Sequence, residues 1–128
     1  KILELESLED QLKLLSGFSD KEQEQFLLYT LKTLSSMDSQ VGSLVRAWTS
    51  GDAQAMESIM SDAALQDASI APIFRKLFDQ RNLKMISRIE GYLNSNGSYF
   101  VIVGAGHLVG TRGIVEMLKS KGYVVEQL

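Results

Sequence analysis

The sequence contains no cysteine, one proline and one histidine. The lack of cysteine excludes disulfide bonds, cysteine-ligated zinc and thiol catalysis. The longest apolar stretch, residues 99–110, is much shorter than the roughly 20 residues that a membrane-spanning helix needs, and it contains His107. Basic residues are scattered and the formal net charge is −3, so the composition gives no electrostatic case for nucleic-acid binding.

The length of 128 residues is enough for one modest domain with a core of its own. The sequence starts at Lys1 without a methionine and shows no signal peptide. Its opening, KILELES, is typical of the interior of a longer chain, so we expect a fragment or a processed chain. We expect residues 1–128 to form a single domain or fragment, with a mainly helical block over 1–93 and a small α/β block over 99–128.

Apolar periodicity predicts helices over most of the first 93 residues. Leucines at 5, 8, 12 and 15 share one helix face, and Ser19 with Glu22 three residues later forms the capping box that starts another helix. Asp52 is placed to cap a helix over 53–60, whereas residues 61–69 are ambiguous. The longest helix is predicted over 70–93, with Pro72 in its first turn.

The pattern changes after the turn at 94–98. Residues 99–103 are aromatic and β-branched, which is typical of a strand buried on both faces. A glycine-rich turn over 104–110, a helix over 111–121 and a strand over 123–128 complete a predicted β-α-β unit. The predicted fold class is therefore α/β (α+β), a mostly helical block packed on a small sheet. Because so few strands leave an exposed edge, we expect an N-terminal half to complete the sheet, or a homodimer to form through the open edge.

His107 follows the end of the predicted buried strand, which is where open α/β sheets bind their ligands. Its imidazole titrates near neutrality and is a common metal ligand. Gly104, Gly106 and Gly110 allow the backbone to turn tightly and a ligand to approach closely. The other interpretation is a hydrogen-bonded loop histidine. A nucleotide site is disfavoured, because G-x-G-x-x-x-G is one residue longer than the dinucleotide fingerprint and no Gly-Lys-Ser/Thr follows.

Asn82 lies on the inner stripe of the longest predicted helix, with Arg81 beside it. A buried amide or guanidinium is costly without partners, so both residues either reach the His107 loop or a substrate, or else satisfy neighbouring backbone and solvent. By pattern alone, Glu4 and Glu6 are typical of an exposed helix N-terminus. A catalytic zinc site needs about three protein ligands, so with one histidine and no cysteine any further ligands must be carboxylates or lie outside this chain.

Several short motifs occur in a fixed order along the chain. Leu-Glu-Ser-Leu-Glu-Asp-Gln at 5–11 comes first, followed by Trp-Thr-Ser-Gly-Asp at 48–52 and Arg-Asn-Leu-Lys-Met at 81–85. Gly-Ala-Gly-His-Leu-Val-Gly at 104–110 and Gly-Tyr-Val-Val at 122–125 complete the series. In this order the motifs resemble the C-terminal half of the TraB/GumN family. That family includes the Tiki proteases and is grouped with the ChaN-like and erythromycin-esterase-like folds.

The resemblance implies a site made of two Gly-x-x-His motifs and a glutamate. Gly104 and His107 match the second such motif, Glu6 matches the glutamate, and Arg81 with Asn82 matches the family's Arg-Asn pair. The first Gly-x-x-His has no counterpart here, because His107 is the only histidine. The resemblance therefore implies that a missing N-terminal half supplies it, and that this fragment alone is inactive.

For the complete protein, the resemblance implies a metal-dependent, peptidase-like hydrolase that uses Mn, Co or Zn. His107 and Glu6 are the expected metal ligands or bases, and Arg81 is expected to neutralise or position charge. Residues expected to bind substrate or orient the loop are Asn82, Gly104, Gly106 and Gly110. The alternatives are a non-catalytic binding or regulatory protein, linked to pheromone inhibition or exopolysaccharide production, and a structural fragment without a site. The resemblance also implies an extracytoplasmic or membrane-associated location.

Overall fold

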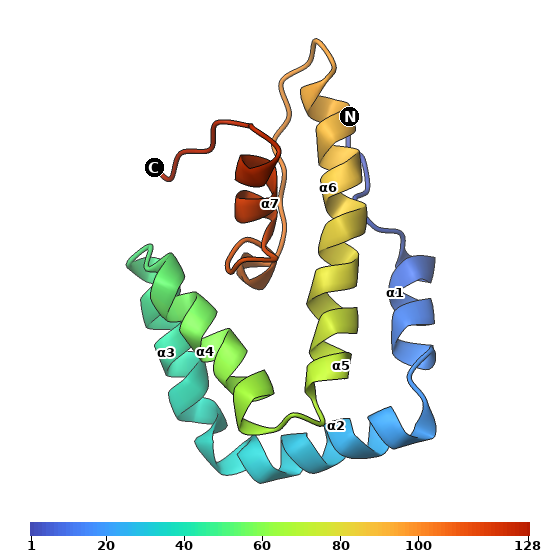
Figure 1. The fold of residues 1–128 in the computed structure, drawn as a ribbon, viewed down its shortest axis with the longest axis vertical. Coiled ribbons are helices and arrows are strands. Elements are labelled where there is room, and N and C mark those ends of the chain that lie inside the picture. Colours follow the sequence, from blue (N-terminus) through green and yellow to red (C-terminus); the bar gives the residue numbers. More distant parts are fainter.

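The computed structural model describes the backbone of residues 1–128 and the side chains of all of them except 63–66. The chain is built from helices joined by turns and extended segments. In Figure 1, α2 crosses one end of the molecule, α3 and α4 rise on one side of it, and α5 and α6 rise on the other, with α7 between the two arms. The elements are α1 (Leu8–Ser16), α2 (Asp20–Thr33), η1 (Leu34–Ser36), α3 (Met37–Thr49), α4 (Ala53–Gln66), α5 (Ala71–Phe74), η2 (Arg75–Asp79), α6 (Gln80–Leu93), η3 (Ala105–His107) and α7 (Ile114–Ser120).

Side-chain caps define where the first helices begin. The capping box predicted at Ser19 and Glu22 is confirmed, because each residue's side chain accepts a hydrogen bond from the other's backbone N–H. An equivalent box between Ser7 and Asp10 starts α1 at Leu8 rather than at Leu5. The Asp52 cap is also confirmed, since the backbone N–H of Ala55 donates to its carboxylate at 2.8 Å. These starts follow from local chemistry, because a capping side chain satisfies N–H groups that the helix cannot bond itself.

The helix predicted over 70–93 is a nearly continuous helical rod made of α5, η2 and α6. Its middle, η2, is a π-helical turn, in which the backbone N–H of Gln80 donates to the carbonyl of Arg75, five residues earlier. A π turn holds one more residue than an α turn and occurs often at functional sites. Here it immediately precedes Arg81 and Asn82, so it sets the direction in which both side chains leave the rod.

The predicted sheet is wrong: no strand is present in the described backbone, and the fold is helical rather than α/β. Residues 99–103 and 123–128 are extended, and neither segment forms a ladder with the other or with the remaining described chain. Phe100 is 90% exposed and Ile102 is 78% exposed, so the first segment is not buried on both faces. A strand needs a neighbour to receive its backbone hydrogen bonds, and this chain places none beside either segment. Of the predicted β-α-β unit, only the helix remains, as α7.

Two small apolar clusters hold the rod to its neighbours. Phe18, Ile70 and Ile73 form one cluster, which joins the start of α2 to α5. The other joins α6 to α7 and contains Met85, Ile86, Ile89 and Ile114, with Val103 and Leu5 packed against it. The π turn and Asn82 lie on the rod between these clusters, so packing on both sides fixes this part of the molecule.

Much of the remaining apolar surface is uncovered. The leucine stripe of α1 stays in solvent, with Leu8 at 72% exposure. Within the described residues, no helix is both long and apolar enough to cross a membrane. The homodimer predicted through an open sheet edge stays a prediction, although the sheet on which it depended is absent.

Candidate functional site

His107 closes a tight turn between the extended segment at 99–103 and α7. Its backbone N–H donates to the carbonyl of Gly104 at 2.9 Å, which forms the short helix η3. The side chain is 6% exposed, and its ring centroid lies 5.3 Å from that of Phe78 on the π turn. The only histidine is therefore held inside the molecule, against the middle of the rod.

Two of the three glycines in this turn have a structural role. Gly110 has a φ of +85°, a left-handed conformation that side chains disfavour. Gly106 has an ordinary backbone, but a Cβ there would lie 2.6 Å from the Cε of Met60 and 3.2 Å from Phe78. A Cβ on Gly104 would meet only ordinary contact distances. A side chain at Gly106 would therefore require the end of the Met60 side chain to shift and the Phe78 ring to give slightly.

Asn82 fixes the proton of the imidazole. Its amide Nδ2 donates to the backbone carbonyl of Arg112 at 2.7 Å. A carbonyl can only accept, so the other amide atom, Oδ1, must face His107, and it lies 2.6 Å from Nδ1. Oδ1 is itself only an acceptor, so Nδ1 of His107 must carry a hydrogen. The predicted inward position of Asn82 is confirmed by its 2% exposure.

The neutral imidazole therefore presents an unprotonated Nε2. Burial lowers the pKa of His107, and the positive charge of Arg81 lowers it further, against an opposing effect of the Glu6 carboxylate. Nε2 forms no hydrogen bond with a described group, yet no fully buried side-chain polar atom among the described residues lacks a partner. It follows that Nε2 keeps contact with solvent. A nitrogen lone pair in this state can accept a proton or bind a metal ion.

Arg81 and Glu6 form a bidentate ion pair. Its Nε donates to Oε1 of Glu6 at 2.8 Å and its Nη2 donates to Oε2 at 2.6 Å, while Nη1 donates to the carbonyl of Leu77. The pair is mostly buried, with 23% of the Arg81 side chain and 9% of the Glu6 side chain exposed. The hydrogen bonds and the positive charge of Arg81 lower the pKa of Glu6, against an opposing effect of burial. Glu6, Arg81 and His107 thus lie close enough together to act on one another electrostatically.

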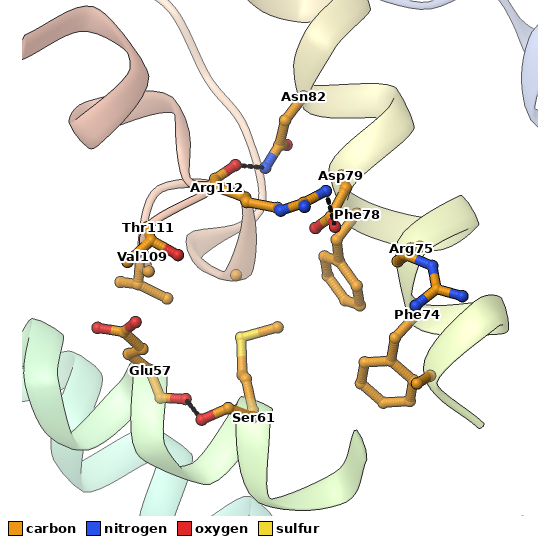
Figure 2. A pocket seen from close by; sticks show the side chains of 14 residues that line it. Glu57, Ser61, Phe74, Arg75, Phe78, Asp79, Asn82, Val109, Thr111 and Arg112 are labelled. Atoms are coloured by element: carbon orange, nitrogen blue, oxygen red, sulfur yellow. Dashed lines mark hydrogen bonds and ion pairs between the residues drawn. The ribbon is translucent and has the colours of Figure 1, made fainter. Parts of the chain in front are cut away.

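Figure 2 shows a cavity whose wall includes Asn82, the hydrogen-bond partner of His107. It has a volume of about 260 Å³ and lies between α4, the rod and residues 106–112, with Asn82 and Gly106 in its wall. The sequence patterns did not single out Glu57 or Arg112, which also line it. The sequence could not have pointed to Arg112, because its backbone carbonyl, which any residue has, is the group that orients Asn82.

The described side chains do not by themselves complete a metal centre. Among them, no three histidine, cysteine, aspartate or glutamate residues are grouped as metal ligands. His107 fits the role of one ligand, because Nε2 is unprotonated and Nδ1–H has a hydrogen-bonded partner, as ligating histidines require. Both oxygens of Glu6 accept hydrogen bonds from Arg81, but each oxygen keeps a further lone pair, so the expected role of Glu6 as a ligand stays a prediction. Among the described residues the candidate ligands are His107 and Glu6, which is fewer than the three that a catalytic site needs.

Comparison with known proteins supports the motif-based resemblance. Over 51 residues the chain is 45% identical to a protein named Metalloprotease TIKI homolog from Amphimedon queenslandica, covering 38% of this chain and 10% of that protein. Over 54 residues it is 37% identical to Metalloprotease TIKI2 from Danio rerio, covering 41% of this chain and again 10% of the relative. The matched part is thus a small share of these longer proteins, and no solved structure matches the chain. The sequence model of the TraB/PrgY/gumN family matches residues 1–127, and the chain therefore belongs to that family.

Proposed function

We propose that this chain contributes the histidine side of a hydrolytic site that cleaves peptide bonds. The state of His107 carries the proposal, because Asn82 holds its proton on Nδ1 and leaves Nε2 unprotonated. The two relatives named as metalloproteases support a peptide as the substrate. In this proposal Nε2 takes a proton from the attacking water or binds one metal ion, and Asn82 is a positioning residue.

Arg81 and Glu6 act on this histidine through charge. Burial and the cation of Arg81 keep the pKa of His107 low, against an opposing effect of the Glu6 carboxylate, so the imidazole stays neutral near pH 7. Glu6 is a poor general base in this arrangement, because the hydrogen bonds from Arg81 lower the pKa of its carboxyl. We therefore assign Glu6 the role of counter-ion to Arg81. Each of its oxygens keeps a lone pair, so Glu6 remains the second candidate ligand in this proposal.

A divalent metal, with Mn, Co and Zn as the candidates, belongs to the proposal for the complete protein. Bound there, it would polarise the scissile carbonyl and activate water. The described residues do not group three ligands for it, and we propose that the remaining ligands come from outside the chain. A second Gly-x-x-His in an N-terminal half is the proposed source.

The test uses the full-length protein that contains this chain. Titrations with manganese, cobalt and zinc measure metal binding, and cleavage of a peptide library is followed with and without chelator. We expect His107→Ala to abolish cleavage and chelator to suppress it, while Gln80→Ala, a change at an exposed position of α6, has no effect. Cleavage that survives both His107→Ala and chelation would refute the hydrolase.

A second candidate is a binding or regulatory protein that holds a ligand without turnover. The observation in its favour is that the described residues group no three metal ligands, while Glu6 serves as the counter-ion of Arg81. If metal neither binds nor affects the full-length protein, and His107→Ala weakens ligand binding alone, this candidate is the correct one.

A further inference from the structure

The cavity next to His107 has an apolar floor. Met60 lines it from α4, Phe74 and Phe78 line it from the rod, and Val109 lies on the side opposite the rod. The volume of about 260 Å³ is below the roughly 300 to 1,000 Å³ of pockets that enclose a whole drug-sized ligand. It therefore matches one large apolar side chain rather than a complete small molecule.

Two carboxylates line the cavity, and they differ in whether they have a partner. Asp79 is paired, because Nη1 of Arg112 donates to its carboxylate at 3.1 Å. Glu57 is half-buried in the wall, yet its carboxylate forms no ion pair or hydrogen bond with any described side chain. It stands beside residues 109–111, across the cavity from Arg75 in Figure 2. The cavity thus has an anionic end at Glu57 and a cationic end at Arg75.

We propose that this cavity binds an apolar side chain of a peptide, and that a positively charged nitrogen next to that side chain pairs with Glu57. The apolar floor supplies affinity by burying the side chain, and the Glu57 carboxylate supplies a charge-assisted hydrogen bond. Arg75 at the other end repels a second positive charge, so the peptide has one favoured direction. The nitrogen belongs either to a peptide amino terminus or to a lysine or arginine side chain.

The cavity is connected to the histidine through shared residues. Phe78 contacts the His107 ring on one side and the cavity on the other, and Asn82 both lines the cavity and bonds His107. A peptide bound in the cavity is therefore separated from the imidazole only by the side chains of Phe78 and Asn82. Taking that peptide as the substrate rests on the proposed function, whereas its binding does not.

The experiment is a titration of the ¹⁵N-labelled protein followed by amide chemical shifts. The probes are phenylalaninamide, which has a free amine, its N-acetyl derivative, and N-acetyl-Phe-Lys-amide. We expect roughly millimolar affinity for a probe of this size, with shifts centred on residues 106–112 and on η2. Tighter binding of phenylalaninamide identifies an amino terminus as the partner of Glu57, and tighter binding of the lysine peptide identifies a basic side chain.

Two variants test the assigned contacts. Glu57→Gln should weaken the preferred cationic probe about tenfold and leave the neutral N-acetyl probe unchanged. Asp62→Asn removes the same charge from the exposed face of α4, outside the cavity, and should change neither. Ala71→Leu fills the cavity wall and should weaken all three probes. The proposal is overturned if no probe shifts the cavity residues, or if Glu57→Gln and Asp62→Asn behave alike.

The two proposals fail separately. If the probes bind as expected while His107→Ala and chelator leave cleavage unaffected, the cavity is a binding site and the hydrolase is wrong. If cleavage depends on His107 but the probes do not bind, the hydrolase stands and the cavity proposal is wrong. Circular dichroism of each variant separates loss of binding from loss of folding.

Discussion

Replacing Asn82 with leucine tests the central contact of the site. Leucine is similar in size but forms neither the hydrogen bond to His107 nor that to Arg112. The buried Nδ1–H loses its acceptor without access to water, which costs roughly 1 to 3 kcal/mol. Arg112 is exposed, so its carbonyl recovers a water partner more cheaply. We expect Asn82→Leu to lower the free energy of unfolding by about 2 kcal/mol, and Tm by roughly 7 °C.

The same substitution should move the imidazole proton. Because Nε2 reaches solvent and Nδ1 then lacks a partner, the neutral ring shifts at least partly to the Nε2–H tautomer. Long-range ¹H–¹⁵N spectra report this directly, and the single histidine makes the assignment unambiguous. Gln80→Leu is the control, since it places leucine at an exposed position of the same helix. A wild-type ring protonated on Nε2, or a tautomer unchanged in Asn82→Leu, would refute the reasoning.

Three further predictions concern charge and exposed apolar surface. Arg81→Gln removes a positive charge beside His107 and leaves the Glu6 carboxylate unpaired. We expect a higher His107 pKa in an NMR titration and a loss of about 2 kcal/mol in the free energy of unfolding. An unchanged pKa would contradict the electrostatic effect of Arg81 on His107. Hydrogen bonds from Lys76 lower the pKa of Glu22 from 4.5 to about 2, so its contribution to stability is complete above pH 4.5 and is lost as the pH falls toward 2. Denaturant midpoints should therefore drop less between pH 7 and pH 3 in Glu22→Gln than in the wild type, and parallel losses would argue against this role. Phe100→Ser changes a 90% exposed side chain, so thermal unfolding of this chain should stay within about 0.5 kcal/mol of the wild type, and a larger loss would show that Phe100 is packed.

Sequence patterns predicted the features that depend on neighbouring residues. The Ser19–Glu22 box and the inward position of Asn82 both follow from spacings of three or four residues, and both are confirmed. The predicted strand at 99–103 fails because a strand exists only with a partner, and apolar composition does not reveal whether one is present. The ion pair between Glu6 and Arg81 joins residues 75 positions apart, and helical or strand periodicity cannot predict contacts between residues so far apart in the sequence. The resemblance named both residues, but not their pairing.

The geometry of the site depends on how many residues the π turn contains rather than on which residues they are. An α-helix advances by about 100° per residue, so deleting one residue within η2 to restore a regular α-helix would rotate α6 by that angle relative to α5. Phe74 would keep its place, whereas Asn82 would turn away from His107 and Arg81 away from Glu6. Substitutions at an exposed position such as Arg75 preserve this register. A single deletion next to it would separate every pair that defines the site while leaving the sequence of each motif intact.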